Sequence, residues 1–374
     1  MDLDFAAVLG RMVEVGASDV HLTAGFPPAM RTHGKIAPMA GFEPLTAQQT
    51  RDVVYNILND DQRKRFENNQ QLDFAYAIPR VARFRVNCFF QRGAISAALR
   101  RVPHEIPDLD SLKVPQILRD FTRKPRGFVL VTGPTGSGKS TTLAAMIDLI
   151  NSEREDHILT IEDPIEFLHH HKRSIINQRE IGADAVDFTL GLKAALRQDP
   201  DVILVGEMRD LETISIALTA AETGHLVFAT LHTQSTAQTV DRIIDVFPPQ
   251  QQGQVRTQLS IALQGIVTQQ LLPTANGAGR VVACEVLVPT PAIRNLIREA
   301  KTHQIYAALQ TSGAVGMQTM DADLARLVRS GEITSSLAQQ RASVPEELRR
   351  LLGPLGGPEI AAPRPAQAPV GAVG

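Results

Sequence analysis

Apolar and polar positions follow two different periods in the first hundred residues of this chain. Residues 5–15 and 46–66 carry apolar side chains at helical spacing, which predicts helices, whereas residues 83–90 alternate strictly, which predicts a strand. One face of this strand is apolar: Phe84, Val86, Cys88 and Phe90. The other face carries Arg83 and Arg85. Residues 1–105 are therefore expected to form a small mixed α/β domain.

Beyond residue 105 the pattern changes to short, almost wholly apolar runs separated by helical segments. These runs occupy residues 128–131, 158–161, 202–205 and 226–231. Such runs are typical of parallel strands that helices cover on both faces. The sequence therefore predicts an α/β nucleotide-binding domain, which we place with its linker at residues 106–352.

The C-terminal third predicts further helices and one strand. Residues 251–272 are expected to form one long amphipathic helix, 280–288 a strand and 291–300 a short helix, with more helices to about residue 352. The last segment, residues 353–374, is rich in glycine, proline and alanine. It has too little large apolar surface to offset the entropy of ordering, so we expect it to be disordered.

Charge and cysteine content narrow the class of protein. The chain has 38 Lys and Arg against 40 Asp and Glu, so no net positive charge attracts a phosphate backbone and no nucleic acid is expected as a partner. Cys88 and Cys284 stand far apart, which fits a reducing cytoplasm. No stretch approaches about 18 uninterrupted apolar residues, so any membrane contact is expected to be peripheral.

A phosphate-binding loop follows the first apolar run. The motif GxxxxGK[ST] is matched by Gly133, Pro134, Thr135, Gly136, Ser137, Gly138, Lys139 and Ser140, with Thr141 next. A strand precedes the match and an amphipathic helix follows it, as the motif requires. Glycines let backbone N–H groups turn around an anion, and the helix N-terminus adds partial positive charge. Lys139 is expected to reach the β and γ phosphates of ATP, and the Ser140 hydroxyl to bind Mg²⁺.

Acidic and histidine side chains follow the other apolar runs. Because ligands bind beyond the carboxyl ends of parallel strands, these groups are expected to share one edge of the sheet with the phosphate loop. They are Glu162, Asp163 and Glu166, then Glu207, and then His232, with His225 at the start of its run. Carboxylates beside a phosphate site are suited to positioning water, and Glu207 is expected to act on the metal through a water. The run of histidines at 169–171 is expected to lie in a solvated loop.

In order along the chain, TGPTGSGKSTT, TIEDPIEF, DPDVILVGEMRD and TGHLVFATLHT resemble the four sequence boxes of the secretion ATPase superfamily, which powers type II secretion and type IV pili. The resemblance covers the chain from Ala17 to about Leu352. It implies an N-terminal PAS-like domain, a C-terminal RecA-like P-loop ATPase domain and a homo-hexameric ring. It also implies that Glu166 and Glu207 are the catalytic and Walker B glutamates, and that the histidine pair of the superfamily is His225 and His232.

Within the superfamily the chain looks like the retraction ATPases of type IV pili. The stretch that carries this likeness is Ala292, Ile293, Arg294, Asn295, Leu296, Ile297, Arg298 and Glu299, supported by residues 316–321. By periodicity alone this stretch is a capped helix that packs on a core. The resemblance implies that it couples ATP hydrolysis to pilin withdrawal and twitching motility, through an inner-membrane platform protein at the pilus base. An accessory retraction ATPase is a further expected partner.

The resemblance also places arginines of the N-terminal domain across a subunit interface, and Arg83 is our candidate for a neighbour's γ-phosphate, with Arg85 second. Guanidinium groups match phosphate oxygens and keep their charge. Four alternatives stay open: an accessory retraction ATPase, an assembly ATPase, a non-hydrolysing nucleotide-gated scaffold and a nucleic-acid motor. The intact Lys139, Ser140, Glu166 and Glu207 count against the scaffold.

Overall fold

The computed structural model describes residues 3–32, 34–78, 82–102, 105–277 and 279–353. Residues 354–374, nearly all of the segment expected to be disordered, lie outside the described residues. Contacts divide the chain into two units. The first comprises Met1–Ile106, Asp163–Leu168 and Arg179–Val186; the second comprises Pro107–Glu162, His169–Gln178 and Asp187–Gly374. Each unit is described by itself.

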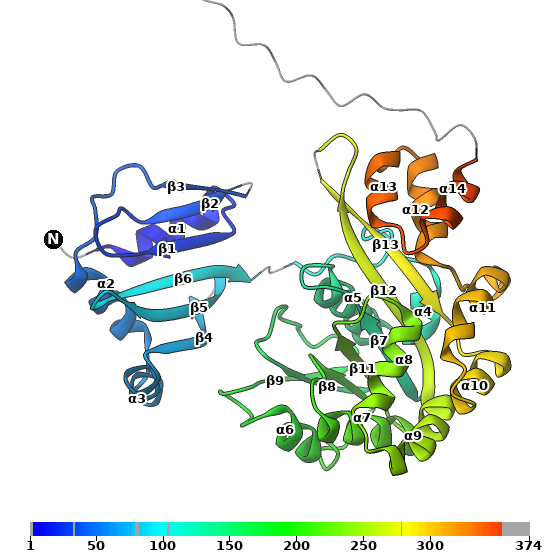
Figure 1. The fold of residues 1–374 in the computed structure, drawn as a ribbon. Helices are drawn as coiled ribbons and strands as arrows, with labels where there is room; N and C mark the ends of the chain where they lie inside the picture. The colour runs from blue at the N-terminus through cyan, green and yellow to red at the C-terminus, as the bar shows by residue number, and fades with distance from the viewer. Residues whose placement is uncertain (1–2, 33, 79–81, 103–104, 278, 354–374) are drawn as a thin grey trace, which may run out of the picture. The chain divides into compact units, whose positions relative to one another are not determined.

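The first unit contains an antiparallel six-stranded sheet with the order β3-β2-β1-β6-β5-β4 (Figure 1). Its strands are β1 (Asp19–Leu22), β2 (Ala29–Thr32), β3 (Lys35–Pro38), β4 (Gln71–Ile78), β5 (Ala82–Gln91) and β6 (Ala94–Val102), and its helices are α1 (Phe5–Glu14), α2 (Ala47–Ile57) and α3 (Asp60–Asn69). The strand expected at 83–90 is confirmed. Its residues Phe84, Val86 and Cys88 are fully buried, while Phe90 is 40% exposed.

The structure has two helices, α2 and α3, where the sequence predicted one. The helix predicted over residues 46–66 breaks where Leu58 takes an extended conformation between α2 and α3. Asn59 then caps α3: its side chain accepts a hydrogen bond from Gln62 N at 2.8 Å, and Gln62 Oε1 accepts one from Asn59 N at 3.1 Å. This reciprocal pair is a capping box, so an N-x-x-Q spacing inside an apparently continuous helix marks a new start.

The second unit is built on a seven-stranded sheet with the order β13-β12-β7-β11-β10-β8-β9. The strands are β7 (Gly127–Thr132), β8 (His157–Glu162), β9 (Ile175–Glu180), β10 (Val202–Val205), β11 (Leu226–Leu231), β12 (Leu263–Pro273) and β13 (Arg280–Leu287). Strands β7, β8, β10 and β11 are parallel, as expected from their apolar runs. The α/β class is thereby confirmed.

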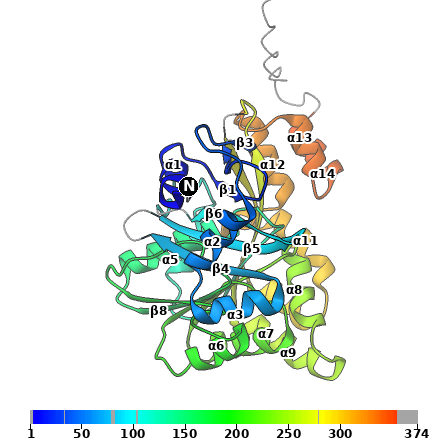
Figure 2. The same ribbon diagram turned by 90° about the vertical axis from the view of Figure 1, so that its left-hand side faces the viewer.

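Helices flank this sheet, and Figure 2 shows α6, α7 and α9 grouped along its lower side. The helices up to this point are α4 (Ile117–Thr122), α5 (Lys139–Glu153), α6 (Phe188–Ala195), α7 (Leu211–Thr223), α8 (Thr236–Asp245) and α9 (Pro249–Ala262). The strand register pairs Thr132 of β7 with both Leu231 of β11 and Thr268 of β12. The carboxyl ends of the parallel strands therefore reach one edge together.

The prediction of one long helix over residues 251–272 is wrong for the second half of this range. The helix α9 ends at Ala262, and β12 begins at Leu263, parallel to β7 and antiparallel to β13. A Cβ atom on Gly265 would lie 2.3 Å from the Phe121 ring, so glycine lets the ring pack directly on β12. The edge strand β9 was not expected from the sequence.

The C-terminal part of the unit is helical. It comprises α10 (Pro291–Arg298), α11 (Ile305–Thr311), α12 (Met320–Arg329), α13 (Ser335–Arg341) and α14 (Pro345–Leu352), with short 3-10 turns at Thr302–Gln304 and Gly313–Val315. Buried side chains of α12, α13 and α14 pack with Leu272, Val281 and Ala283 in one cluster. Within the described ranges, every helix is too short or too polar to span a bilayer.

Candidate active site

The loop predicted to bind phosphate connects β7 to α5 in the second unit. Gly136 and Gly138 have φ values of 79° and 92°, in the left-handed region that glycine enters without steric cost. Pro134 and Thr135 are exposed beside Gly136. A Cβ atom on Gly133 would lie 2.3 Å from Gln269 O and 2.6 Å from Ser137 Oγ. Glycine is therefore required at position 133 by close packing as well as by conformation.

Lys139 lies inside this loop. Its side chain is buried, and Nζ donates hydrogen bonds to the carbonyl oxygens of Gly133 at 2.8 Å and Pro134 at 3.1 Å. The loop thus holds the ammonium group at its centre, where a phosphate oxygen could replace a carbonyl. Ser137 Oγ is buried and has no hydrogen-bond partner among the described residues. Such an orphaned hydroxyl fits a site that takes a polar ligand.

Ser140 and Thr141 occupy the first turn of α5 and are half-buried. Their position at the helix N-terminus places backbone N–H groups and hydroxyls next to the loop. Hydroxyl oxygen is a donor that Mg²⁺ accepts together with phosphate oxygens and water. The residue predicted to bind the metal, Ser140, is therefore suited to it.

Glu207 and His232 are brought together at the carboxyl edge of the sheet. Glu207 follows β10 and His232 follows β11, and Glu207 Oε1 lies 3.1 Å from His232 Nε2. The other carboxylate oxygen, Oε2, accepts a hydrogen bond from Arg209 Nη2 at 2.6 Å. The bond from Arg209 is the main reason that the pKa of Glu207 lies below its ordinary value, with His232 adding to it. The sequence did not indicate Arg209 as a partner.

Gly206 stands where many P-loop proteins have an aspartate before the glutamate. A Cβ atom here would lie 3.2 Å from both Glu162 Cα and Ile161 O in the neighbouring strand. Any side chain at this position would need the two strands to shift. Glu162 itself accepts hydrogen bonds from Thr160 Oγ1 at 2.6 Å and Gln178 Nε2 at 3.2 Å, so its carboxylate is already engaged.

Two of the predicted site residues, Glu166 and His225, do not lie beside Glu207 and His232 within the second unit. Glu166 is exposed on a loop that follows the cis Asp163-Pro164 bond, in a segment of the first unit. His225 lies at the amino end of β11, and its Nδ1 is 3.0 Å from Ala220 O at the end of α7. The length of β11 separates His225 from His232, so these two histidines do not form a pair within the second unit.

Arg83 is paired inside the first unit. Its Nη2 donates to Glu180 Oε2 at 2.7 Å, and the same oxygen accepts a hydrogen bond from Ile165 N at 3.1 Å. Arg83 is 19% exposed at its side chain. Arg85 contacts Asp73 more loosely, with 3.8 Å between Nε and Oδ1, and is far more exposed. Arg83 is thus held in place, whereas Arg85 is a surface residue.

The predicted coupling helix is α10, capped by Thr290, whose side chain accepts a hydrogen bond from Ile293 N. Ile293 and Ile297 are fully buried, so part of the motif is core. Arg294 donates hydrogen bonds to the backbone oxygens of Ser260, Ile261 (2.8 Å) and Leu263 (3.0 Å). It therefore caps the C-terminus of α9, whose last carbonyls have no helical partner.

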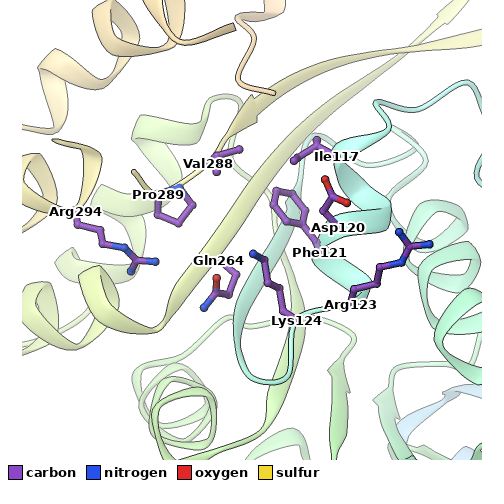
Figure 3. Close-up of a pocket in the computed structure, with 9 residues that line it drawn as sticks. All are labelled: Ile117, Asp120, Phe121, Arg123, Lys124, Gln264, Val288, Pro289 and Arg294. Carbon is purple, nitrogen blue, oxygen red and sulfur yellow. The ribbon is translucent and has the colours of Figure 1, made fainter. Parts of the chain in front are cut away.

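A pocket of about 470 Å³ lies beside this contact (Figure 3). It is lined by Ile117, Asp120, Phe121, Arg123, Lys124, Gln264, Val288, Pro289 and Arg294. The side chains drawn in Figure 3 come from α4 and the residues that follow it, from β12, from the segment between β13 and α10, and from α10 itself. Its lining is thus shared between the coupling helix and the strand next to β7.

Comparison with known proteins identifies the family. The family model described as type II/IV secretion system protein matches residues 6–343. The type IV pilus retraction ATPase PilT of Pseudomonas aeruginosa is 50% identical over 344 residues, which is 92% of this chain and 99% of that protein. A twitching motility protein of Neisseria gonorrhoeae is 52% identical over 321 residues, 86% of each chain.

The fold agrees with this result. The crystal structure of the pilus retraction motor PilT with bound ADP superposes with a TM-score of 0.88 at 50% identity, covering 93% of this chain and 100% of that one. The family resemblance seen in the sequence is confirmed. The chain belongs to the type II/IV secretion system protein family.

Proposed function

We propose that this chain is a P-loop ATPase motor that converts ATP hydrolysis into type IV pilus retraction and twitching motility. The observation that carries the proposal is the alignment, over nearly the whole of both chains, with a protein named as a type IV pilus retraction ATPase. The phosphate loop and the Glu207–His232 pair supply the corresponding chemistry in this chain.

ATP is bound by the loop from Gly133 to Thr141. Backbone N–H groups and the N-terminus of α5 face the phosphates, Lys139 exchanges its carbonyl contacts for phosphate oxygens, and Ser137 Oγ gains a partner. Ser140 would hold Mg²⁺ through its hydroxyl oxygen, and Glu207 would contact the metal through a water molecule. When bound, Mg²⁺ offsets the charge on the phosphate oxygens.

Hydrolysis requires an oriented water, because phosphoryl transfer depends on positioning and charge stabilisation. Glu166 is proposed as the catalytic glutamate, since it is an exposed carboxylate in the box that follows β8. Glu207 and His232, with 3.1 Å between Oε1 and Nε2, are proposed to act together at the carboxyl edge of the sheet. His225 remains a predicted catalytic residue. It lies at the amino end of β11, opposite to the end that carries His232, so the geometry of the second unit does not support a catalytic role for it.

The subunits are proposed to form a homo-hexamer in which residues 1–105 are a PAS-like domain and residues 106–352 hold the RecA-like ATPase domain. The six-stranded antiparallel sheet supports the first assignment, and the parallel order β7-β11-β10-β8 supports the second. ATP shifts each subunit between two conformations through its higher affinity for one of them, and Arg83 reaches the γ-phosphate of the neighbouring subunit.

The motor is proposed to work in the cytoplasm at the inner-membrane base of the pilus. Its contacts there are the platform protein and an accessory retraction ATPase. The exposed positions of α10 and its C-cap, which include Asn295, Arg298 and Glu299, are the surface proposed to transmit movement. No nucleic acid is required.

Steady-state phosphate release by the purified ring tests the ATPase, with Lys139→Ala as the central variant. The wild type should release phosphate from Mg·ATP, and Lys139→Ala should form the same oligomer with at least a hundredfold lower rate, because the central cation is lost. The matched control is Lys172→Ala, since Lys172 pairs with Asp148 on the surface. Retained turnover in Lys139→Ala would contradict the phosphate assignment.

Complementation tests the biological role. The wild-type gene should restore twitching to a strain without its retraction ATPase, and Lys139→Ala should not. A wild type that hydrolyses ATP but restores no twitching would exclude retraction while leaving the ATPase in place.

A further inference from the structure

We infer that three buried threonines, Thr132, Thr239 and Thr233, are positioning residues that tie the strand before the phosphate loop to the Glu207–His232 pair. The inference rests on the proposed ATPase function and extends it. It assigns side chains that hold the two halves of the site at a fixed separation, although none of them belongs to the predicted set of site residues.

The first contact starts at Thr132, the last residue of β7 and the one directly before Gly133. Its side chain is fully buried, and its Oγ1 lies 2.8 Å from Oγ1 of Thr268 in β12. On the other side, Oγ1 of Thr239 in α8 lies 3.5 Å away, a long contact. The start of the phosphate loop is thus connected through hydroxyl groups to a neighbouring strand and to the helix α8.

The second contact connects α8 to the catalytic edge. Oγ1 of Thr239 lies 2.7 Å from Oγ1 of Thr233, and both residues are buried. Thr233 directly follows His232, whose Nε2 is 3.1 Å from Glu207 Oε1. A short series of contacts therefore leads from Gly133 through three buried threonines to His232 and Glu207, whose side chains are 43% and 20% exposed.

The beginning of α8 is held on its other side as well. Glu285 of β13 is 2% exposed, and its Oε1 accepts hydrogen bonds from Thr236 N at 2.7 Å and from Thr236 Oγ1 at 2.8 Å. Residues 233–236 are therefore anchored at both ends. The loop that carries His232 cannot shift without breaking buried hydrogen bonds.

Hydroxyl pairs suit this task better than apolar contacts. A buried hydroxyl that loses its partner costs free energy, and hydrogen bonds are directional, so they define a distance that hydrophobic packing leaves adjustable. Valine has nearly the shape of threonine but cannot form the bond. A threonine that only fills the core would therefore affect stability, whereas a positioning threonine would affect turnover.

The test measures kcat and KM for ATP, with the melting temperature, in the full-length ring. Thr239→Val should lower kcat about threefold to tenfold with KM within about twofold, as expected for one hydrogen bond that matters in the transition state. Thr239→Ser keeps the hydroxyl and should stay within about twofold of wild-type kcat. The matched control is Thr122→Val, because Thr122 is equally buried and bonds Arg119 O at 2.8 Å. It should lose stability but keep kcat.

Thr233→Val provides a second measure, since it removes the same bond from the other side. The double variant Thr233→Val/Thr239→Val should have the kcat of Thr239→Val alone, because Thr239→Val already removes the Thr233–Thr239 bond together with the bond that Thr239 Oγ1 donates to Ser235 O at 2.8 Å. Equal kcat in Thr239→Val and Thr122→Val, failure of Thr239→Ser to recover kcat, or additive losses in the double variant would each overturn the inference. Absence of wild-type turnover would instead reject the proposed function.

Discussion

His169 shows how burial changes a residue that lies in a run of histidines. The prediction of a solvated loop is wrong for it, because its side chain is only 2% exposed and its Nδ1 lies 4.0 Å from Asp148 Oδ1. Burial lowers the pKa of His169 to about 4, since the charged ring would lose its hydration. At neutral pH the ring is therefore neutral.

This burial predicts a pH-dependent stability. The unfolded chain has a His pKa near 6.5, so between about pH 6.5 and 4 it binds more protons than the folded state, and stability falls as the pH falls through this window. The loss between pH 7 and pH 5 should be about 2 kcal/mol. Urea unfolding at both pH values would measure it.

His169→Gln should remove this part of the pH dependence, whereas His303→Gln, at an exposed position, should retain it. If wild type and His169→Gln lose the same stability between pH 7 and pH 5, the ring does not titrate as its burial requires.

The site residues differ in how far sequence alone could predict them. The phosphate loop could be predicted because its chemistry lies in one contiguous segment between a strand and a helix. Glu207 and His232 could be placed at one edge because each follows an apolar run. Arg209 and the buried threonines could not, because their partners are set by packing through space, and an isolated threonine carries no sequence signal.

At the scale of elements, the sequence from 251 to 272 fits two periods. Apolar residues in its second half, such as Leu263, Ile266 and Val267, recur at helical spacing but also form a dense run that a buried strand can use. Pairing with β7 decides for the strand. The edge strand β9 was missed for the opposite reason, because its exposed and buried positions give no clear alternation.

The contact between α10 and α9 predicts that one arginine of the coupling motif is structural. Arg294 bonds three backbone oxygens and is partly buried, so Arg294→Gln should lower the free energy of unfolding by about 1.5–3 kcal/mol. Arg298→Gln is the control, since Arg298 is exposed and, among the described residues, its side chain donates a hydrogen bond only to Asn295 Oδ1. This substitution should change the free energy of unfolding by about 0.5 kcal/mol or less.

Urea unfolding at neutral pH would compare the two variants. Equal stabilities would show that the helix cap is dispensable, and loss of twitching in Arg294→Gln could then be assigned to coupling. If the expected difference is found, loss of twitching in Arg294→Gln must first be separated from unfolding.

At the scale of the whole molecule, the chain divides into two units, and predicted site residues fall in both. Glu166 and Arg83 belong to the first, while Lys139, Glu207 and His232 belong to the second. A ring in which one subunit completes its neighbour's site would use this division. Arg83 is already paired with Glu180, so reaching a neighbour's phosphate would require that bond to open.

Mixed rings test this arrangement. Arg83→Ala and Lys139→Ala should each be nearly inactive alone, but rings assembled from both should regain turnover, because one subunit then supplies the phosphate loop and its neighbour the arginine. Phosphate release across a mixing series would measure the recovery. Arg11→Ala is the control, and it should be active without mixing because Arg11 is an exposed residue of α1 outside the candidate site.

Full activity of Arg83→Ala alone, or no recovery on mixing, would show that Arg83 does not act across the interface. In the second case a role within its own subunit would remain, through the bond to Glu180.

The crowding around Gly133 has a practical consequence for experiments on nucleotide binding. A methyl group at this position would push against Gln269 O and act as a wedge between β7 and β12. Since β12 also pairs with β13, a shift of β12 would displace β13, which lies at the edge of the sheet. An alanine at position 133 would therefore damage the scaffold and the loop at once, whereas Lys139→Ala removes side-chain atoms and adds none between the strands.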